Sequence, residues 1–196
     1  MRRIATILLL LVVLVSFTAA EGIDEVSRYW TIDHYDIKAV MDEDGVLSIE
    51  ERITANFRGY YHGILKTIPA SNNVWDIKCS APFAVETENN ELVIRIGSAD
   101  TLITGKIEYV LTYKMDPKVK YEFVFTVPGI WSVDVFDLAF TLTIPKDRFY
   151  GCAMEIKDLL PSGKTFETYE DADGRLVLKG SASRIPAYGN MDLVLR

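Results

Sequence analysis

The sequence predicts an all-β protein, a two-sheet antiparallel immunoglobulin-like β-sandwich of roughly ten strands that follows a signal peptide. Three observations predict this class. Apolar and polar residues alternate with a period of two through most of residues 35–195. Turn residues (Asp, Asn and Gly) separate these runs at short spacing. After the leader, no segment of helical length shows a clean helical period.

The N-terminus reads as an export signal. Two arginines precede an unbroken apolar run at residues 4–15, and small residues stand at Thr18 and Ala20, where a signal peptidase reads the chain. We therefore expect a signal peptide at residues 1–20 and a single β-sandwich domain at 21–196. An uncleaved leader that anchors the protein is the alternative, although the apolar run is shorter than the roughly 20 residues that span a bilayer. Either reading places the domain outside the cytoplasm, secreted or on the extracytoplasmic face of the cell membrane.

The first strands form a predicted hairpin. Residues 35–41 and 47–57 alternate on either side of an acidic turn that ends at Gly45, which is a strong hairpin signal. Glu51 interrupts the apolar face of the second strand once. The same turn partly imitates a calcium loop, with Asp42, Asp44 and Glu51 at ligand positions. The first ligand position holds a valine and the flanking segments alternate like strands, so the pattern favours the hairpin.

Further strands follow along the chain. Alternation or β-branched and aromatic composition predicts them at residues 74–79, 84–88, 91–96, 102–113, 121–127, 133–144, 152–156, 166–169, 175–179 and 191–195. Residues 155–160 are compatible with a turn or two of helix. No Pro-, Gly- or Ser-rich linker divides the chain into two domains.

Composition excludes several functional classes. The chain carries 21 basic and 28 acidic residues, for a net charge of −7, and contains no basic block. Nucleic acid is therefore not an expected partner. His34 and His62 lie at no metal-ligand spacing from either cysteine, so neither a metal nor a cofactor is expected. Cys79 and Cys152 form a disulfide bond or remain two buried free thiols; the sequence leaves both open.

Aromatic residues and glycines gather in one segment. Residues 58–63 contain Arg58 and then Tyr60, Tyr61 and His62 between two glycines, and Trp131 follows another glycine further along the chain. Such side chains suit an amphipathic interaction surface, while the alternative is a loop whose aromatic rings tie a strand end to the core. The interaction reading requires that Tyr60 and Trp131 be substantially exposed to solvent.

An ordered set of motifs resembles a known family. The motifs are LSIEERIT at 47–54, FRGYYHGI at 57–64, IRIGS at 94–98, YVLTY at 109–113 and PGIW at 128–131. In this order they resemble the N-terminal extracytoplasmic domain of predicted membrane proteins, domain of unknown function 2207. The resemblance implies a signal peptide, a β-rich domain and transmembrane helices after it. No apolar span follows residue 196, so membrane association would come through an uncleaved leader or a missing C-terminal helix.

No catalytic signature accompanies the fold, because the sequence lacks a nucleophile elbow and a phosphate-binding glycine loop. We therefore expect a non-enzymatic, exported or cell-surface module that binds a protein or an envelope component. A carbohydrate-binding module is the first alternative, since three tryptophans are available to stack on sugar rings. An envelope hydrolase with a pair of acidic residues is the second.

Overall fold

The computed structural model describes residues 29–117, 123–146, 152–155 and 161–195, with the backbone alone at 152–155. The expected signal peptide at residues 1–20 lies outside these residues, as do residues 156–160 of the expected helical turn.

The described residues form thirteen strands and one short 3₁₀ helix. They are β1 (Trp30–Met41), β2 (Leu47–Tyr61), β3 (Gly63–Pro69), η1 (Ala70–Asn72), β4 (Val74–Cys79), β5 (Phe83–Glu88), β6 (Glu91–Gly97), β7 (Ile103–Met115), β8 (Phe123–Val127), β9 (Val135–Ile144), β10 (Cys152–Glu155), β11 (Thr165–Glu170), β12 (Leu176–Ile185) and β13 (Met191–Leu195).

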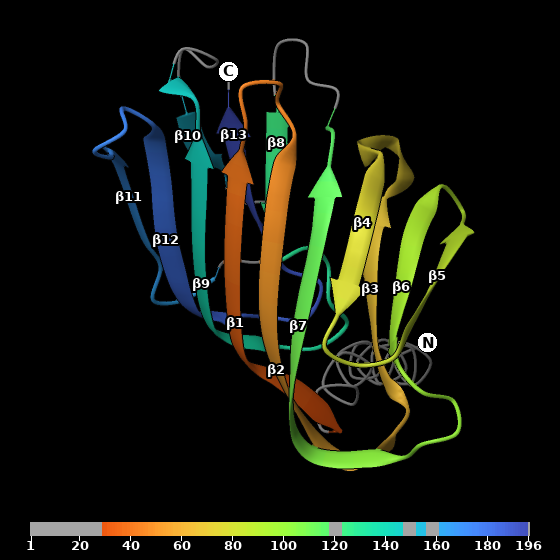
Figure 1. The fold of residues 1–196 in the computed structure, drawn as a ribbon. Helices are drawn as coiled ribbons and strands as arrows, with labels where there is room; N and C mark the ends of the chain where they lie inside the picture. The colour runs from red at the N-terminus through yellow and green to blue at the C-terminus, as the bar shows by residue number, and fades with distance from the viewer. Residues whose placement is uncertain (1–28, 118–122, 147–151, 156–160, 196) are drawn as a thin grey trace, which may run out of the picture.

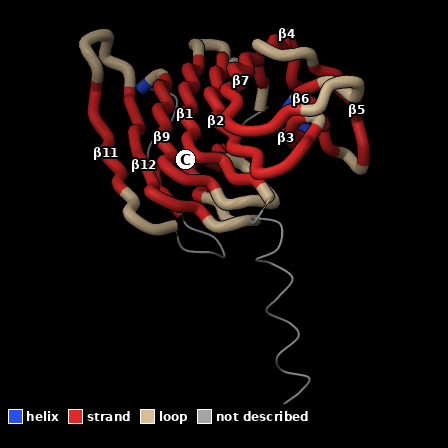
Figure 2. Tube along the Cα trace, turned by 90° about the horizontal axis from the view of Figure 1, so that it is seen from below, coloured by secondary structure: helices blue, strands red, loops and turns tan. Residues whose placement is uncertain are grey.

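The strands pair into one large sheet and two small ones. The large sheet has the order β11-β12-β9-β1-β2-β7-β4, and the small sheets have the orders β10-β13-β8 and β3-β6-β5. Figure 1 shows β10, β13 and β8 behind the large sheet. Figure 2 shows β3, β6 and β5 at the end of the molecule away from β11. The second layer of the sandwich is thus divided into two separate sheets.

All three sheets share one core. Ile37 on β1, Ile94 on β6 and Leu193 on β13 belong to a single cluster of buried residues. From Tyr35 to Met41 in β1 and from Leu47 to Phe57 in β2 every second side chain is buried, as the period-two pattern predicts. Glu51 occupies one of these inward positions on β2 and is 2% exposed.

The all-β sandwich is confirmed, with three differences of detail from the expected arrangement. There are three sheets rather than two, thirteen strands rather than roughly ten, and β1 pairs with β9 in parallel. The additional strand with the greatest consequence is β3, because the predicted strands included none of its residues. Alternation cannot predict which strands become neighbours, because it reports only which face of a strand is buried.

The acidic turn between β1 and β2 is a hairpin turn, as expected. The amide N–H groups of Asp44 and Val46 donate to Asp42 Oδ1 at 3.0 and 2.9 Å. The N–H of Gly45 donates to the carbonyl of Asp42 at 3.0 Å. Asp42 therefore uses its carboxylate to close the turn.

Candidate functional site

A buried ion pair joins the large sheet to one small sheet. Lys66 on β3 places its Nζ 3.1 Å from Oε1 of Glu51 on β2, and the two side chains are 7% and 3% exposed. Both residues take inward positions in strands whose other inward residues are apolar. A buried charge is costly unless it is paired and hydrogen-bonded, so the remaining contacts of this pair decide its role.

Two tyrosines complete the hydrogen bonding of the carboxylate. Tyr35 on β1 donates to Glu51 Oε2 at 2.5 Å, and Tyr113 on β7 donates to Oε1 at 2.8 Å. Burial, and then the charge of Glu51, raise the pKa of both tyrosines well above the ordinary value of 10.0. Both hydroxyls therefore stay protonated and keep donating across the physiological pH range.

The ammonium group of Lys66 also has a complete set of hydrogen-bond partners. Besides Glu51, Lys66 Nζ donates to the hydroxyl of Tyr35 and to the backbone carbonyl of Pro128, each at 3.0 Å. It lies 5.6 Å from the ring centroids of Tyr35 and Trp131, within the range of cation–π attraction. Because an ammonium has three protons, these partners satisfy it. The cluster is therefore built to hold strands together, and it ties β3 to the segment that follows β8.

A cavity of about 330 Å³ lies over this cluster, between β3 and β8. Its lining includes Thr67, Ile68 and Pro69 of β3, Val124, Phe125 and Thr126 of β8, the cluster residues Glu51, Lys66 and Tyr113, and Ile37, Ser71, Asn72, Glu91, Met115, Gly129, Ile130 and Asn190. The lining thus combines apolar and polar side chains in similar proportion, and the polar groups can orient a ligand.

The aromatic residues predicted from the sequence divide between surface and core. Tyr60 is 76% exposed, as expected, but Trp131 is 4% exposed, so the expectation of an exposed Trp131 is wrong. The Trp131 indole packs edge-on against Trp30 and Tyr35 and donates to the Pro128 carbonyl. It is a core ring beside Lys66.

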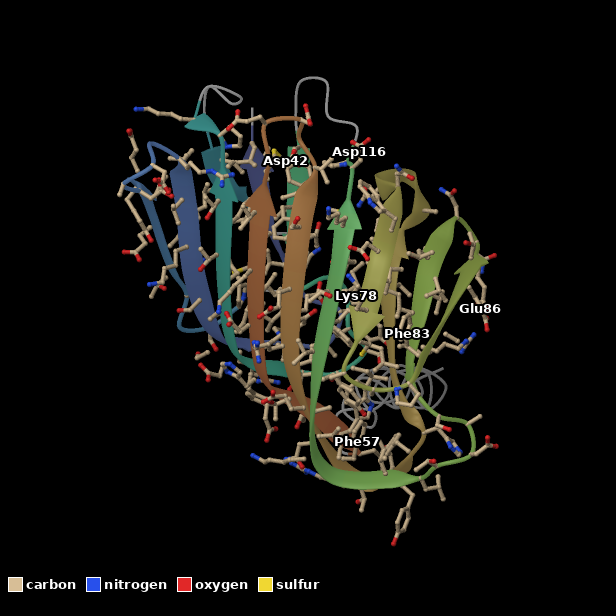
Figure 3. The ribbon with its side chains drawn as sticks, viewed as in Figure 1. Asp42, Phe57, Lys78, Phe83, Glu86 and Asp116 are labelled. Carbon is tan, nitrogen blue, oxygen red and sulfur yellow. The ribbon has the colours of Figure 1, made fainter. Side chains whose placement is uncertain are left out.

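The segment 58–61 continues β2 and is not a loop. Its ring contacts lead inward, because Tyr61 packs on Phe57 at 5.1 Å between ring centroids and Phe57 stacks on Trp30 at 5.6 Å. Figure 3 shows Phe57 at the end of the molecule opposite to Asp42. Arg58 is exposed. His62 lines a separate hollow of about 390 Å³ beside Leu65 and Ala99.

Among the described residues, every pair of aromatic rings in contact includes at least one buried ring, so no pair forms an open platform for a sugar.

Cys79 on β4 has a free thiol in this structure, and the side chain of Cys152 lies outside the described residues. The disulfide bond between them therefore stays a prediction. His34 contacts Asp137 at 2.8 Å on the surface. Within the described ranges, no group of three or more His, Cys, Asp and Glu residues could hold a metal ion.

Glu51 was visible in the sequence as a break in an apolar face, but its role was missed. Lys66 carries the same signal, since it stands between Ile64 and Ile68 on the inward face of β3. That signal appears only after residues 63–69 are read as a strand.

Comparisons with known proteins support the fold and the family. A family model described as the N-terminal domain of predicted membrane proteins, domain of unknown function 2207, matches residues 31–175. None of the curated proteins compared matches the chain. In the part of the chain that the structure describes, no helix has the length and apolar character needed to cross a membrane.

Two solved structures contain a similar fold. One is described as a putative protease from Parabacteroides distasonis, with a TM-score of 0.60 and 9% identity over 86% of this chain and 40% of that one. The other is a two-domain M1 zinc metallopeptidase, in a substituted form bound to L-tryptophan, with a TM-score of 0.51 and 11% identity over 86% of this chain and 43% of that one. The present chain therefore spans about two fifths of the length of each, and at these identities the likeness shows the fold alone.

Proposed function

Because this chain belongs to the predicted membrane proteins with an N-terminal domain of unknown function 2207, we propose that its sandwich is a non-enzymatic binding module. It works on the extracytoplasmic side of the membrane and binds a protein or an envelope component. The cavity between β3 and β8 receives the ligand.

The single observation that carries the proposal is this cavity. It opens at the division of the second layer, and its floor is a charged cluster whose hydrogen bonds are complete. A satisfied floor does not need to reorganise when a ligand arrives, which reduces the free-energy cost of binding. Apolar walls supply contact area, and the side chains of Ser71, Asn72 and Asn190 supply polar groups at the rim.

The solved structures support the description of this fold as a module. The fold occurs as about two fifths of two longer chains described as peptidases. A sandwich of this kind is thus found as one part of larger proteins, which suits a module that presents a ligand.

The proposal is tested by nuclear magnetic resonance of the labelled domain. The probes are a tryptic digest of envelope proteins and, separately, an enzymatic digest of envelope glycans. At least one probe should shift the amide signals of Thr67, Ile68 and Thr126 and leave Leu65 and Ala99, in the His62 hollow, unchanged.

A matched pair of variants sharpens the test. Ser71→Trp fills the mouth of the cavity. It should lower the apparent affinity, measured from the amide shifts, at least tenfold. Ala99→Trp adds the same ring at the other hollow and should change nothing. Unshifted cavity amides with both probes, or equal binding by the two variants, would overturn the proposal.

A further inference from the structure

Two unpaired strand edges flank the cavity. β3 is the outer strand of the order β3-β6-β5, and β8 is the outer strand of the order β10-β13-β8. Among the described strands, each has a hydrogen-bonded neighbour on one side only, β6 for β3 and β13 for β8. β3 lines the cavity with four consecutive residues, 66–69, and β8 with three, 124–126. The cavity therefore has an edge strand on each of two sides.

Such edges favour the addition of another strand. An edge strand presents a row of N–H and C=O groups that can pair with an extended segment of another chain. One added strand between β3 and β8 would join the two small sheets into a continuous second layer opposite the large sheet. A strand held in this way would make main-chain hydrogen bonds on both of its sides.

We propose that the cavity binds an extended peptide segment of a partner protein, inserted as a strand between β3 and β8. This inference rests on the proposed function and names the class of its ligand. Four lining residues on β3 and three on β8, at about 3.3 Å per residue, give a length of about 10 to 13 Å, which holds three to four residues of peptide.

The cavity walls define which side chains the peptide presents. Ile37, Ile68, Met115 and Phe125 are apolar lining residues, and the charges of Glu51 and Lys66 are already paired with each other, so the side chain that points toward the large sheet is apolar. Its neighbours along the peptide point outward, because successive residues of a strand alternate.

Charge at the cavity favours a basic peptide. Lys66 is already paired with Glu51, which leaves Glu91 as the acidic group without an ion-pair partner among the described residues that line the cavity. Its carboxylate attracts a lysine, an arginine or an amino terminus. The segment is thus an extended peptide with one apolar residue facing inward and a positive charge near the rim.

The slot has one defined end. Lys66 crosses from β3 to the carbonyl of Pro128, the residue after β8, and this bond ties the two edge strands together there. Gly129 lies beside it, where an added Cβ would be 3.2 Å from Lys66 Nζ. The peptide therefore enters on the side of Pro69 and Val124.

The test begins with end-blocked hexapeptides that alternate apolar and variable residues and carry one lysine. Binding to the domain at residues 21–196 is measured by calorimetry. The tightest peptide is then remade in two forms, one with N-methyl groups on its odd-numbered amides and one with them on its even-numbered amides. Because an inserted strand directs successive amides toward opposite neighbours, methylation in either form should weaken binding at least tenfold. Binding that survives methylation in one or both forms would overturn insertion between two strands.

A charge test uses matched variants. Glu91→Gln should weaken binding of the lysine peptide several-fold and leave its glutamine analogue unaffected. Glu86→Gln removes a carboxylate from β5 that pairs with Arg95 and does not line the cavity, and should leave both affinities unchanged. Equal losses in the two variants would contradict the assigned position of the positive charge.

The two proposals fail in different ways. If the glycan digest shifts the cavity amides and no hexapeptide binds, the binding module stands and the peptide inference falls. If neither the digests nor the peptides perturb the cavity, both fall.

Discussion

The charged cluster gives the sharpest prediction, through a double-mutant cycle on Glu51 and Lys66. Glu51→Met leaves an ammonium and two tyrosine hydroxyls without their shared carboxylate, so we expect a loss of about 5 kcal/mol in the free energy of unfolding. Lys66→Met leaves a carboxylate that still accepts from two tyrosines, so its cost is nearer 3 kcal/mol. The double variant leaves only neutral hydroxyls unpaired and should cost about 2 kcal/mol.

The assay is urea unfolding at pH 7, followed by tryptophan fluorescence and circular dichroism. The coupling free energy, the difference between the double variant and the sum of the single ones, should reach several kcal/mol. Tyr35→Phe and Tyr113→Phe remove one hydrogen bond each and provide milder readings if a methionine variant does not fold. A double variant that costs as much as the sum of its parts would refute the reasoning, because independent costs mean that the two charges do not stabilise each other.

Three further predictions concern pH, backbone and export. Because burial and the adjacent carboxylate raise the pKa of Tyr113, the unfolded chain loses this proton first above about pH 10, and stability falls by about 1.4 kcal/mol per pH unit. Tyr113→Phe should make this alkaline decline shallower in urea titrations, and the decline that remains belongs to Tyr35, whose pKa burial and Glu51 raise in the same direction. Gly97→Ala should cost about 2 kcal/mol or more, because φ is +130° and the new Cβ would lie 2.0 Å from a carbonyl oxygen. Gly59→Ala should stay within about 0.5 kcal/mol in the same thermal melts. The intact mass of the exported protein should correspond to a chain that begins at Glu21, and a retained leader would contradict this.

Local alternation predicted most of the fold. Residues 74–79 form β4 with the predicted bounds, and β5 and β6 each begin or end within one residue of the prediction. Of these strands only β6 has buried residues, and every residue of β5 is exposed, so the bounds of β5 followed from composition and the adjacent turn rather than from a buried face. The parallel pairing of β1 with β9 could not be predicted, because it depends on contacts between residues more than 90 positions apart.

β3 was missed because its inward face carries a charge. Ile64, Lys66 and Ile68 all point inward, but a lysine in that row resembles a solvent-facing residue. Glu51 posed the same difficulty on β2. Each charge is intelligible only beside the other, and the sequence gives no direct indication that β2 and β3 place them 3.1 Å apart.

Trp131 illustrates the opposite difficulty. A tryptophan after a proline and a glycine resembles an exposed loop residue, but the ring lies against a buried cation and two other aromatic rings. Exposure depends on what covers a residue, and here the cover comes from β1 and β3. The interaction surface inferred from residues 58–62 therefore stays a prediction for Tyr60 and its exposed neighbours.

The division of the second layer explains why a charged cluster stands where an apolar floor would be expected. A continuous second sheet would seal the face of β1, β2 and β7, and leucine or isoleucine would suit the position of Glu51. Between two separate sheets the floor lies under the cavity. Apolar side chains alone would leave the small sheets free to slide there, because hydrophobic contact has no preferred direction. The bonds from Lys66 to Glu51, Tyr35 and Pro128 are directional, and they fix the edge of β3 relative to β8. Weakening the cluster should therefore reduce affinity at the cavity before it unfolds the sandwich, which Tyr113→Phe can test by comparing hexapeptide binding with stability at pH 7.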